Sequence, residues 1–271
     1  MLQVNSLQAG YGKTTILHDI SFEMGEGKFV CILGANGCGK TTLLKAILGI
    51  IASQKGQVLL DGEDVHKMHV KDLARKMAYI PQAHIPPFPF KVRDVVQMGR
   101  TPYLGYMGRT KAGDGKLVDD IMDMLEISWM AERSYNTLSG GQRQMVVVAR
   151  ALAQQPRLLI MDEPTASLDF GHQYTVLNQM VNLSQNGMSV IMVTHDPDHA
   201  FFCATKTITM KGGRILDMGL PRRVIVEQAM EDIYRTKVKI ADIQLTEQDS
   251  TSICVPVHTF KPIKDLLGKR E

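Results

Sequence analysis

Cysteine is scarce in this sequence, and the few that occur are not spaced like metal ligands. The chain has 271 residues, and its four cysteines stand at positions 31, 38, 203 and 254. Cys31 falls in an apolar run, and Cys38 falls inside a glycine-rich loop. We therefore expect reduced thiols and a cytosolic setting.

Long apolar runs are also missing. No segment approaches the eighteen uninterrupted apolar residues that indicate a transmembrane helix, so we expect a chain that does not itself span a membrane. The first ten residues, MLQVNSLQAG, lack the basic start and the apolar stretch of a signal peptide. The sequence thus predicts neither an anchor nor an export signal.

Charge of one sign is not concentrated anywhere. The formal net charge is +3, and no run of Lys and Arg stands out. A nucleic-acid-binding surface is therefore disfavoured relative to an ordinary mixed surface. The composition, 44% hydrophobic and 22% charged, is typical of a soluble globular protein with a sizeable core. We find no internal repeat and no low-complexity tract.

A phosphate-binding loop is present near the N-terminus. The apolar run FVCIL at 29–33 is typical of a strand buried on both faces, and it leads into GANGCGKTT at 34–42 and then a helical run. This order is the context that a P-loop requires. Backbone N–H groups of Gly37, Gly39 and Lys40 should surround the β-phosphate. The alternative, a chance glycine-rich turn, is disfavoured by the flanking strand and helix.

Two side chains of this loop have further expected roles. Lys40 supplies positive charge between the β- and γ-phosphates, and the Thr41 hydroxyl is a ligand for Mg²⁺. Thr42 is placed to touch the α-phosphate. A nucleoside triphosphate is therefore the predicted ligand.

A second buried strand should bring carboxylates to the metal. The run RLLIMDEP at 157–164 has four apolar residues before Asp162 and Glu163. Ligands of open parallel sheets bind at the carboxyl ends of the strands. Asp162 would hold Mg²⁺ through water, and Glu163 would point at an attacking water. The alternative is a solvated turn with two adjacent acids.

A third buried strand, within SVIMVTHD at 189–196, ends next to His195. His199 follows four residues later, which raises the possibility of a zinc site, but zinc needs three or four ligands and we find no third at a sensible spacing. His195 at the carboxyl edge is better placed to touch a γ-phosphate.

A second candidate anion site lies about a hundred residues after the P-loop. LSGGQRQ at 138–144 precedes an apolar, helix-forming run at 145–153. Ser139, Gly140 and Gly141 would offer free N–H groups at the positive end of a helix dipole. One small chain thus carries two helix N-termini that can bind phosphate, on separate segments. This makes a composite site across a two-fold axis reasonable.

Together these pieces resemble the ATP-binding cassette family, the motor subunits of ABC transporters, over residues 2 to about 225. GANGCGKTT resembles the Walker A loop, LSGGQ the signature, and LLIMDEP the Walker B strand with its catalytic glutamate. SLD at 167–169 resembles the D-loop and His195 the switch histidine. Gln82 in YIPQ resembles the Q-loop glutamine, and Tyr11 resembles the aromatic residue that stacks on adenine.

The resemblance implies roles for particular residues. Implied nucleotide-binding residues are Tyr11, Gly34, Asn36, Gly37, Cys38, Gly39, Lys40, Thr41 and Thr42. Implied catalytic residues are Glu163, His195 and Gln82, and implied Mg²⁺ ligands are Thr41, Gln82 and Asp162. The implied contacts to a partner's ATP come from Ser139, Gly140, Gly141 and Gln142, and the implied D-loop residue is Asp169.

The resemblance also implies a fold and a division of the chain. The predicted fold is α/β: a P-loop NTPase cassette with a RecA-like parallel-sheet core, a small antiparallel β subdomain and a helical insertion. Antiparallel strands are expected over residues 2 to about 30 and 56–65. The parallel core is expected over 29–51 and 156–215, with the helical insertion at about 85–153 between them.

The predicted ATPase domain covers residues 2–236 and the predicted C-terminal extension covers 237–271. KGGRILDMG at 211–219 indicates a hairpin, and SICVPV at 252–257 indicates one more strand packed on the core. HIPPFPF at 84–90 contains three prolines, which exclude a helix and favour a stiff segment beside Gln82.

The segment MGRTPYLGYMGR at 98–109 indicates the transporter type. Its glycines, aromatics and proline make a poor helix and favour an exposed docking loop, although composition alone fits a linker equally well. The pattern GR-x-PYLG is similar to importer ATPases for iron–siderophores, haem and vitamin B12, and also to molybdate importers. In those proteins the helical subdomain receives a cytoplasmic helix of the permease.

The resemblance therefore implies the ATP-hydrolysing motor of a prokaryotic importer of metal chelates. Its implied partners are a second cassette of the same kind, integral-membrane permease subunits and, indirectly, a substrate-binding protein, at the cytoplasmic face of the membrane; no nucleic acid is implied. An importer of molybdate or tungstate is the alternative. A soluble ABC ATPase is disfavoured because the chain has neither a long coiled coil nor a second cassette. A lone P-loop kinase or GTPase would not use LSGGQ.

Overall fold

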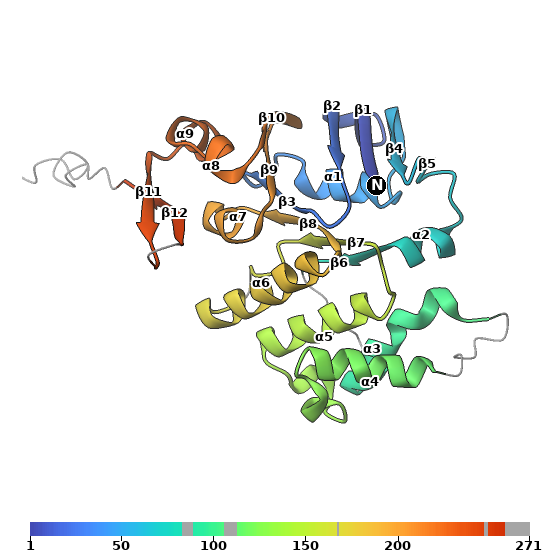
Figure 1. Ribbon diagram of the computed structural model, residues 1–271. Helices are drawn as coiled ribbons and strands as arrows, with labels where there is room; N and C mark the ends of the chain where they lie inside the picture. Colours follow the sequence, from blue (N-terminus) through green and yellow to red (C-terminus); the bar gives the residue numbers. More distant parts are fainter. Residues whose placement is uncertain (83–88, 106–112, 167, 247–248, 258–271) are drawn as a thin grey trace, which may run out of the picture.

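The structure is a computed structural model, and it describes residues 1–82, 89–105, 113–166, 168–246 and 249–257. The described strands form a six-stranded sheet, a four-stranded sheet and a two-stranded hairpin. In Figure 1 the four-stranded sheet stands above one end of the six-stranded sheet, the helices α3, α4 and α5 lie below it, and the hairpin lies at the far left.

The six-stranded sheet has the order β10-β9-β3-β8-β7-β6. Its strands are β3 (Phe29–Gly34), β6 (Met77–Ile80), β7 (Leu158–Asp162), β8 (Ser189–Thr194), β9 (Lys206–Lys211) and β10 (Arg214–Gly219). All neighbours pair in parallel except β9 and β10, which form the antiparallel hairpin expected at 211–219. Every residue of β3, β7 and β8 is buried, which confirms the three strands expected from continuous apolar runs.

The predicted limits of the parallel core were incomplete, because β6 lies outside them. Its four residues, MAYI, directly follow the helix α2 (Val70–Lys76) and pair with β7. So short an apolar run after a helical stretch has no periodicity of its own to show that it is a strand. Gln82 follows β6 by two residues, so the sheet edge itself positions it.

The four-stranded sheet confirms the expected antiparallel region. Its order is β2-β1-β4-β5, with β1 (Leu2–Tyr11), β2 (Thr14–Met24), β4 (Ser53–Leu60) and β5 (Glu63–Asp64). The helix α1 (Lys40–Ile47) contacts three of these strands and also β3 and β7 of the six-stranded sheet. Its buried side chains, such as Leu43 and Leu44, belong to one core cluster with residues of both sheets, so the P-loop helix lies between the two sheets.

The expected helical insertion contains α3 (Val92–Gln97), α4 (Asp114–Met124) and α5 (Gly140–Leu152) between β6 and β7. Three short 3₁₀ turns, Met98–Tyr103, Ser128–Met130 and Tyr135–Thr137, join them. Val95, Val118 and Val146 from the three helices share one buried cluster with strands β3, β7 and β8. HIPPFPF lies mostly outside the described residues, and its stiffness stays a prediction.

The end of the described chain packs on helix α7. After β10 come α8 (Pro221–Val224) and α9 (Glu227–Tyr234), and then β11 (Val238–Gln244) and β12 (Ser250–Pro256) pair in antiparallel register. The backbone N–H of Cys254 donates to Asp198 Oδ1 at 2.8 Å, which attaches β12 to α7 (Pro197–Cys203). The strand expected at 252–257 is thus present, paired with a strand that had not been predicted. The boundary at 236/237 stays a prediction.

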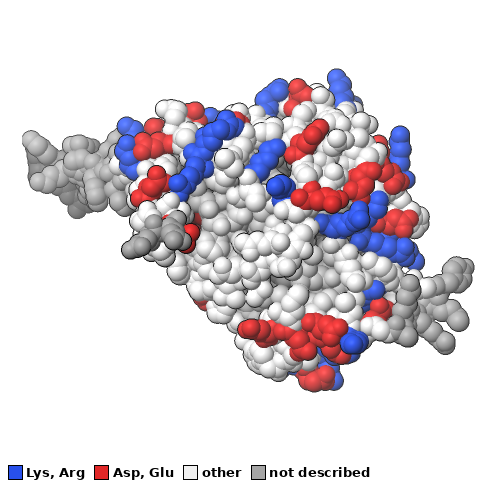
Figure 2. Space-filling model, in the orientation of Figure 1, with Lys and Arg blue, Asp and Glu red and all other residues white. Residues whose placement is uncertain are grey.

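The remaining long helix, α6 (Phe170–Gln185), carries no Asp, Glu, Lys or Arg along its 16 residues. On the face shown in Figure 2, charged side chains of both signs gather over the upper part and the lower edge. The middle of this face, where Figure 1 places α6 and α7, is largely free of them. In the part of the chain that the structure describes, no helix is long and apolar enough to cross a membrane.

Candidate nucleotide-hydrolysis site

The P-loop connects β3 to α1 in a backbone conformation that requires glycine at two positions. Gly37 has φ +78° and Gly39 has φ +106°, both in the left-handed region that side chains disfavour. Gly34 is crowded instead: a Cβ there would lie 2.7 Å from Cys38 Sγ and also press on the backbone of Met210. Burial raises the pKa of the Cys38 thiol, so this side chain packs as an apolar group.

A hollow of about 420 Å³ opens over this loop. Its lining residues come from β2, the P-loop, the segment after β6 and the end of β7: Ile16, Asn36, Gly37, Gly39, Lys40, Thr41, Thr42, Gln82 and Glu163. Most were predicted from the sequence. Ile16 was not, because an apolar residue on an alternating strand has no sign of a binding role. An apolar wall beside the polar loop suits a nucleotide, which has both kinds of surface.

Tyr11, the predicted adenine-stacking residue, is not among the residues that line this hollow. It ends β1 and is 47% exposed. Lys45 of α1 approaches it, with Nζ 3.5 Å from the hydroxyl and 5.8 Å from the ring centroid. The role of Tyr11 stays a prediction.

Glu163 is the point at which the predicted catalytic residues meet. Gln82 Nε2 donates to Glu163 Oε2 at 3.3 Å, and His195 Nδ1 lies 3.3 Å from the same oxygen. Lys40 Nζ lies 4.0 Å from Glu163 Oε1. Three elements far apart in sequence, β6, β8 and the P-loop, thus deliver their polar residues to one carboxylate that is only 13% exposed.

The backbone of Glu163 is in an uncommon conformation. Its φ is +48°, which is rare for a residue with a long side chain, and its N–H donates to Val193 O at 3.0 Å. The hydrogen bond to β8 holds this left-handed turn directly after the end of β7. Backbone strain of this kind is characteristic of functional positions. It turns the Glu163 side chain into the hollow, where a carboxylate can orient a water.

The ammonium group of Lys40 is hydrogen-bonded to two backbone oxygens of the P-loop. Its Nζ donates to Gly34 O at 2.7 Å and to Ala35 O at 3.1 Å, although the side chain is only 5% exposed. A buried ammonium with these partners is a point charge fixed beside the glycine turn. Phosphate oxygens in the hollow would be stronger acceptors for it than carbonyl groups.

The oxygen ligands that Mg²⁺ prefers are present next to Lys40. Asp162 ends β7 and is 5% exposed, and a hydrogen bond connects it to the Thr41 side chain. Burial raises the pKa of Asp162, because the charged carboxylate has lost its hydration. A divalent cation would offset that loss, so these two residues fit a magnesium site. Gln82, the third predicted ligand, lines the same hollow and contacts Glu163.

Tyr79 is a neighbour of Asp162 that sequence analysis missed. It lies on β6, its hydroxyl is 3.5 Å from Asp162 Oδ2, and burial followed by the nearby charge of Asp162 raises its pKa to about 12. It therefore stays a neutral donor to the carboxylate. Sequence analysis could have placed Tyr79 beside Asp162 only if β6 had been recognised as a strand that pairs with β7.

The signature residues lie on a different part of the molecule. Ser139 caps α5: its Oγ accepts from the Gln142 N–H at 3.3 Å, and Gln142 Oε1 accepts from the Ser139 N–H at 3.1 Å. None of the four signature residues lines the P-loop hollow; Gly141 and Gln142 line another groove, with Trp129 and His172. The expectation that this helix start and the P-loop lie on separate segments is confirmed.

Asp169 begins α6. Its Oδ1 accepts from the His172 N–H at 3.0 Å, and its Oδ2 lies 2.7 Å from His172 Nδ1. These two bonds lower the pKa of Asp169 and keep it ionised. Position 167 of the SLD segment lies outside the described residues. His172 was not predicted; Asp169 is an N-cap residue type that the sequence shows, but the contact of the His172 ring depends on how α6 packs.

The segment 98–109 was expected to be an exposed docking loop, and this expectation is wrong for residues 99 and 100. Residues 98–103 form a 3₁₀ turn in which Gly99 and Arg100 are buried. Arg100 Nε donates to Asp114 Oδ1 at 2.8 Å and Nη1 donates to Ala153 O at 2.7 Å. Glycine at 99 allows close approach of the α5 backbone, since a Cβ would clash with the Arg150 carbonyl. Residues 106–109 lie outside the described ranges.

The same turn attaches the helical part to α2. Arg75 donates through Nε and Nη2 to Pro102 O at 3.2 and 3.0 Å, and its guanidinium lies 5.1 Å from the Tyr103 ring centroid. The Tyr103 hydroxyl donates to Gln154 O at 2.8 Å. Because α2 leads directly into β6 and Gln82, this contact links residues 102–103 to the strand that positions Gln82.

His199 has a structural environment. It is 4% exposed, its Nδ1 lies 3.2 Å from the Thr194 hydroxyl, and burial lowers its pKa. Within the described ranges, no group of three or more His, Cys, Asp or Glu side chains is arranged to hold a metal ion. The zinc alternative for His195 and His199 therefore gains no support from the geometry.

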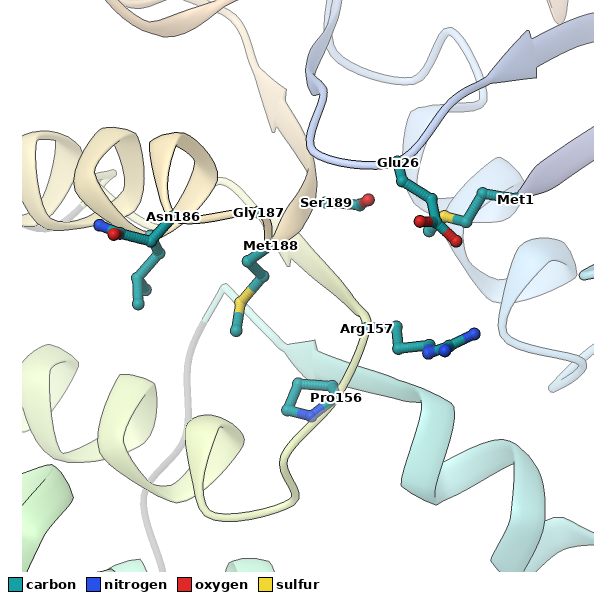
Figure 3. Close-up of a pocket in the computed structure, with 9 residues that line it drawn as sticks. Met1, Glu26, Pro156, Arg157, Asn186, Gly187, Met188 and Ser189 are labelled. Carbon is teal, nitrogen blue, oxygen red and sulfur yellow. The ribbon is translucent and has the colours of Figure 1, made fainter.

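A second hollow, of about 330 Å³, lies at the opposite edge of the six-stranded sheet (Figure 3). Its lining includes Glu26 before β3, Pro156 and Arg157 before β7, and residues 186–189 at the start of β8. Arg157 Nη1 lies 3.5 Å from Asp61 Oδ2. Unlike the hollow over the P-loop, it has no group of side chains that meet at one atom.

Comparison with known proteins places this geometry in a family. The family model for ABC transporters matches residues 17–166. An uncharacterized ABC transporter ATP-binding protein of Haemophilus influenzae is 37% identical over 253 residues, covering 93% of this chain and 96% of the relative. An iron(3+)-hydroxamate import ATP-binding protein of Bacillus subtilis is 33% identical over 267 residues, covering 98% of both chains.

Two further comparisons point the same way. A hemin import ATP-binding protein of Nocardia farcinica is 36% identical over 233 residues, covering 85% of this chain and 80% of the relative. A solved structure described as a metal-chelate type ABC transporter in an inward-facing conformation matches with a TM-score of 0.84 at 28% identity, covering 98% of this chain and 99% of that one.

This chain therefore belongs to the ABC transporter family. It is one of the family's ATP-binding subunits, and as such it is an ATPase. The fold is that of the ABC cassette, as expected from the sequence.

Proposed function

We propose that this chain is the ATP-hydrolysing motor subunit of a prokaryotic importer for metal chelates, of the iron–siderophore, haem or cobalamin type. It would act at the cytoplasmic face of the membrane, docked on permease subunits and indirectly served by a substrate-binding protein. The relatives named for iron(3+)-hydroxamate and hemin import support this cargo class. In this proposal residues 2–236 are the ATPase domain, with 85–153 inserted, and 237–271 are an extension.

The observation that carries the proposal is the meeting of Lys40, Gln82 and His195 at Glu163. Glu163 would orient and polarise the attacking water, as a general base or positioning carboxylate. His195 would then stabilise the γ-phosphate as negative charge develops on it. Gln82 contacts Glu163 directly and follows β6, so a change at the γ-phosphate can reach the helical part through it.

Asp162 and Thr41 would hold Mg²⁺, with Gln82 as the third ligand. When bound, the ion would supply positive charge against the phosphate oxygens. Tyr79 keeps Asp162 in place by donating to its carboxylate from the neighbouring strand. Each of these groups belongs to this chain, so the metal site would be complete before any partner arrives.

The phosphate site would be completed by a second copy of the chain. Ser139, Gly140, Gly141 and Gln142 do not line the P-loop hollow of their own chain, and Ser139 is exposed at the start of α5. We propose that they bind the γ-phosphate held by the partner's Walker A loop, and that Asp169 lies at the same interface. Phe170, which is 78% exposed beside Asp169, and the uncharged helix α6 suit burial against another protein surface.

Uptake by the reconstituted transporter tests the proposal. The chain is affinity-purified from detergent-solubilised membranes, and the integral-membrane protein that copurifies is placed with it in liposomes. With the binding protein encoded nearby, we expect ATP-dependent uptake of a ferric chelate, haem or cobalamin, and no uptake with Glu163→Gln. Uptake of molybdate or tungstate alone would select the alternative cargo. Absence of any membrane partner would contradict the transport function.

A further inference from the structure

We infer that His172 is a positioning residue that ties the signature turn to Asp169 within one chain. The inference rests on the proposed function in one respect, namely that both Ser139–Gly141 and Asp169 face a second copy. His172 is the third residue of α6. Its side chain lies against both Asp169 and the signature glycine Gly141. It touches neither the P-loop hollow nor Glu163 in the described contacts.

The first connection is to Asp169. Since an ionised carboxylate can only accept, His172 Nδ1 carries the proton in the 2.7 Å contact with Asp169 Oδ2. The other carboxylate oxygen accepts the His172 backbone N–H at 3.0 Å. Both oxygens of Asp169 are thus oriented by one residue, which restricts the rotation of a side chain that is 70% exposed.

The second connection is to the signature glycine. Gly141 is buried, and a Cβ added to it would lie 2.7 Å from Cγ of His172 and closer still to Cδ2. The His172 ring therefore occupies the space that any side chain at position 141 would need. It does so inside a groove of about 190 Å³ between the helical part and α6, lined also by Leu125, Trp129 and Met145.

These two connections have a mechanical consequence. Gly141 belongs to α5 of the helical part, whereas Asp169 follows β7 of the parallel sheet. A movement of α5 toward α6 would press Gly141 against the His172 ring and so act on the carboxylate that the ring holds. Contact of a partner's phosphate with Ser139–Gly141 would in this way fix the position of Asp169 in the same chain. In the sequence the signature turn and Asp169 are almost thirty residues apart, so His172 connects segments that are not neighbours along the chain.

Three variants of the full-length chain separate the two connections. His172→Phe keeps a ring against Gly141 and loses the donor to Asp169. His172→Asn keeps an amide donor near Asp169 and loses the ring, and His172→Ala loses both. His69→Ala is the matched control, because the His69 ring is likewise hydrogen-bonded at a helix start: it accepts the Lys71 N–H at the start of α2, away from this groove.

Each change is made in the Glu163→Gln background, and Mg-ATP-dependent dimerisation is followed by light scattering. We expect His172→Ala to raise the ATP concentration for half-maximal dimerisation about tenfold, and Phe and Asn about threefold each. ATP affinity of the dilute monomer should stay unchanged, because His172 does not line the P-loop hollow. A value for His172→Ala within about twofold of the His69→Ala control, or a parallel loss of monomer affinity, would overturn the inference.

Ser139→Arg distinguishes this inference from the proposed function. If Ser139→Arg leaves ATP-dependent dimerisation intact, the signature does not bind a partner's nucleotide and the proposed function fails. If Ser139→Arg abolishes dimerisation while all three His172 variants behave like the control, the proposed function stands and the role of His172 is refuted.

A second test needs no nucleotide. Gly141→Ala should lower the thermal midpoint of the chain by several degrees, because the new methyl group meets the His172 ring. In the His172→Ala background the same change should be neutral or stabilising, since alanine favours a helix more than glycine does. Equal losses in both backgrounds would show that His172 is not the contact that requires glycine at 141.

Discussion

The two edges of the six-stranded sheet make an informative comparison. Each carries a hollow of similar size, about 420 Å³ at the carboxyl edge and about 330 Å³ at the amino edge. At the carboxyl edge Lys40, Gln82 and His195 meet at Glu163. At the amino edge, drawn in Figure 3, Glu26 and Arg157 are exposed. The ion pair of Arg157 is with Asp61, which does not line that hollow. Volume alone therefore does not distinguish a site.

Chain direction explains the difference. The carboxyl edge faces the start of α1, whose free N–H groups and dipole attract anions. The amino edge faces the ends of α5 and α6, where carbonyl groups point outward: residues 156–157 and 186–189 line that hollow just after these helices. These helix ends would favour a triphosphate at the first edge and disfavour it at the second. Of the four predictions that follow, three pair a substitution at the carboxyl edge with a matched substitution at the amino edge.

The largest effect is expected for Glu163→Gln against Glu26→Gln. Loss of the positioned carboxylate should slow ATP hydrolysis by roughly 10²- to 10⁴-fold without weakening ATP binding. The same chemical change at the amino edge should leave the hydrolysis rate within about twofold. Steady-state phosphate release measures both. Near-normal turnover by Glu163→Gln would remove this residue from the catalytic role.

Lys40→Ala against Arg157→Ala should show the next largest effect. Removing the ammonium group deletes a charge-assisted contact to phosphate, so ATP affinity should fall roughly 10- to 100-fold. Arg157 is exposed, and its loss should leave affinity unchanged. Titration with a fluorescent ATP analogue compares them. Similar losses in the two variants would mean that the effect of Lys40 is not local.

Asp162→Asn should raise the thermal midpoint of the protein in EDTA by a few degrees at neutral pH, since about 1 kcal/mol corresponds to about 2–4 °C for a chain of this size. Burial raises the folded-state pKa of Asp162 above its unfolded value, so the charged carboxylate opposes folding above the folded pKa. The advantage of the variant should therefore disappear below about pH 4, where aspartate is protonated in both states.

Glu26→Gln is the control for this prediction, because Glu26 is exposed. Its thermal midpoint should follow that of the unsubstituted protein across the pH range. An Asp162→Asn advantage that persisted at acid pH would mean that the gain comes from packing or hydrogen bonding and not from the charge.

Tyr11→Ala is expected to have the smallest effect. Stacking reads the base and not the γ-phosphate, so the affinities for ATP and ADP should fall by the same small factor, roughly two- to tenfold. Competition binding of both nucleotides measures it. Unchanged affinities would leave Tyr11 as a strand residue whose ring only contacts Lys45.

The sequence analysis predicted the carboxyl edge because its signals are local. A buried apolar run, a glycine turn and a helix start follow one another at the P-loop, and the acids after β7 and the histidine after β8 stand directly behind apolar strands. The contacts missed were those between segments distant in sequence. Tyr79 depends on a four-residue strand, and the ring of His172 depends on the packing of α5 on α6.

The error at residues 99 and 100 has a related cause. The glycines, aromatics and proline of the segment 98–109 favoured an exposed loop by composition, but Arg100 finds a buried partner in Asp114 and the backbone of Ala153. Burial of a charge depends on a partner that composition does not reveal. The prediction of two half-sites on separate segments, by contrast, needed only local signals. The P-loop and LSGGQ each stand directly before a helix-forming run.

Paired heterodimers test most directly whether each site uses one chain's Walker A loop and the other chain's signature. Lys40→Ala and Ser139→Arg are combined in a Glu163→Gln background, either in one protomer or in opposite protomers of a tagged heterodimer. Trapped Mg-ATP per dimer is counted after rapid gel filtration. Trapping is measured because hydrolysis could require two working sites.

Changes in opposite protomers place both defects in the same composite site and leave the other intact. This heterodimer should trap about one Mg-ATP per dimer, whereas the heterodimer with both changes in one protomer should trap almost none, because each of its sites lacks one phosphate contact. The reverse pattern, with nucleotide kept only when both changes are in the same protomer, would show that each signature serves its own chain and would contradict the composite site.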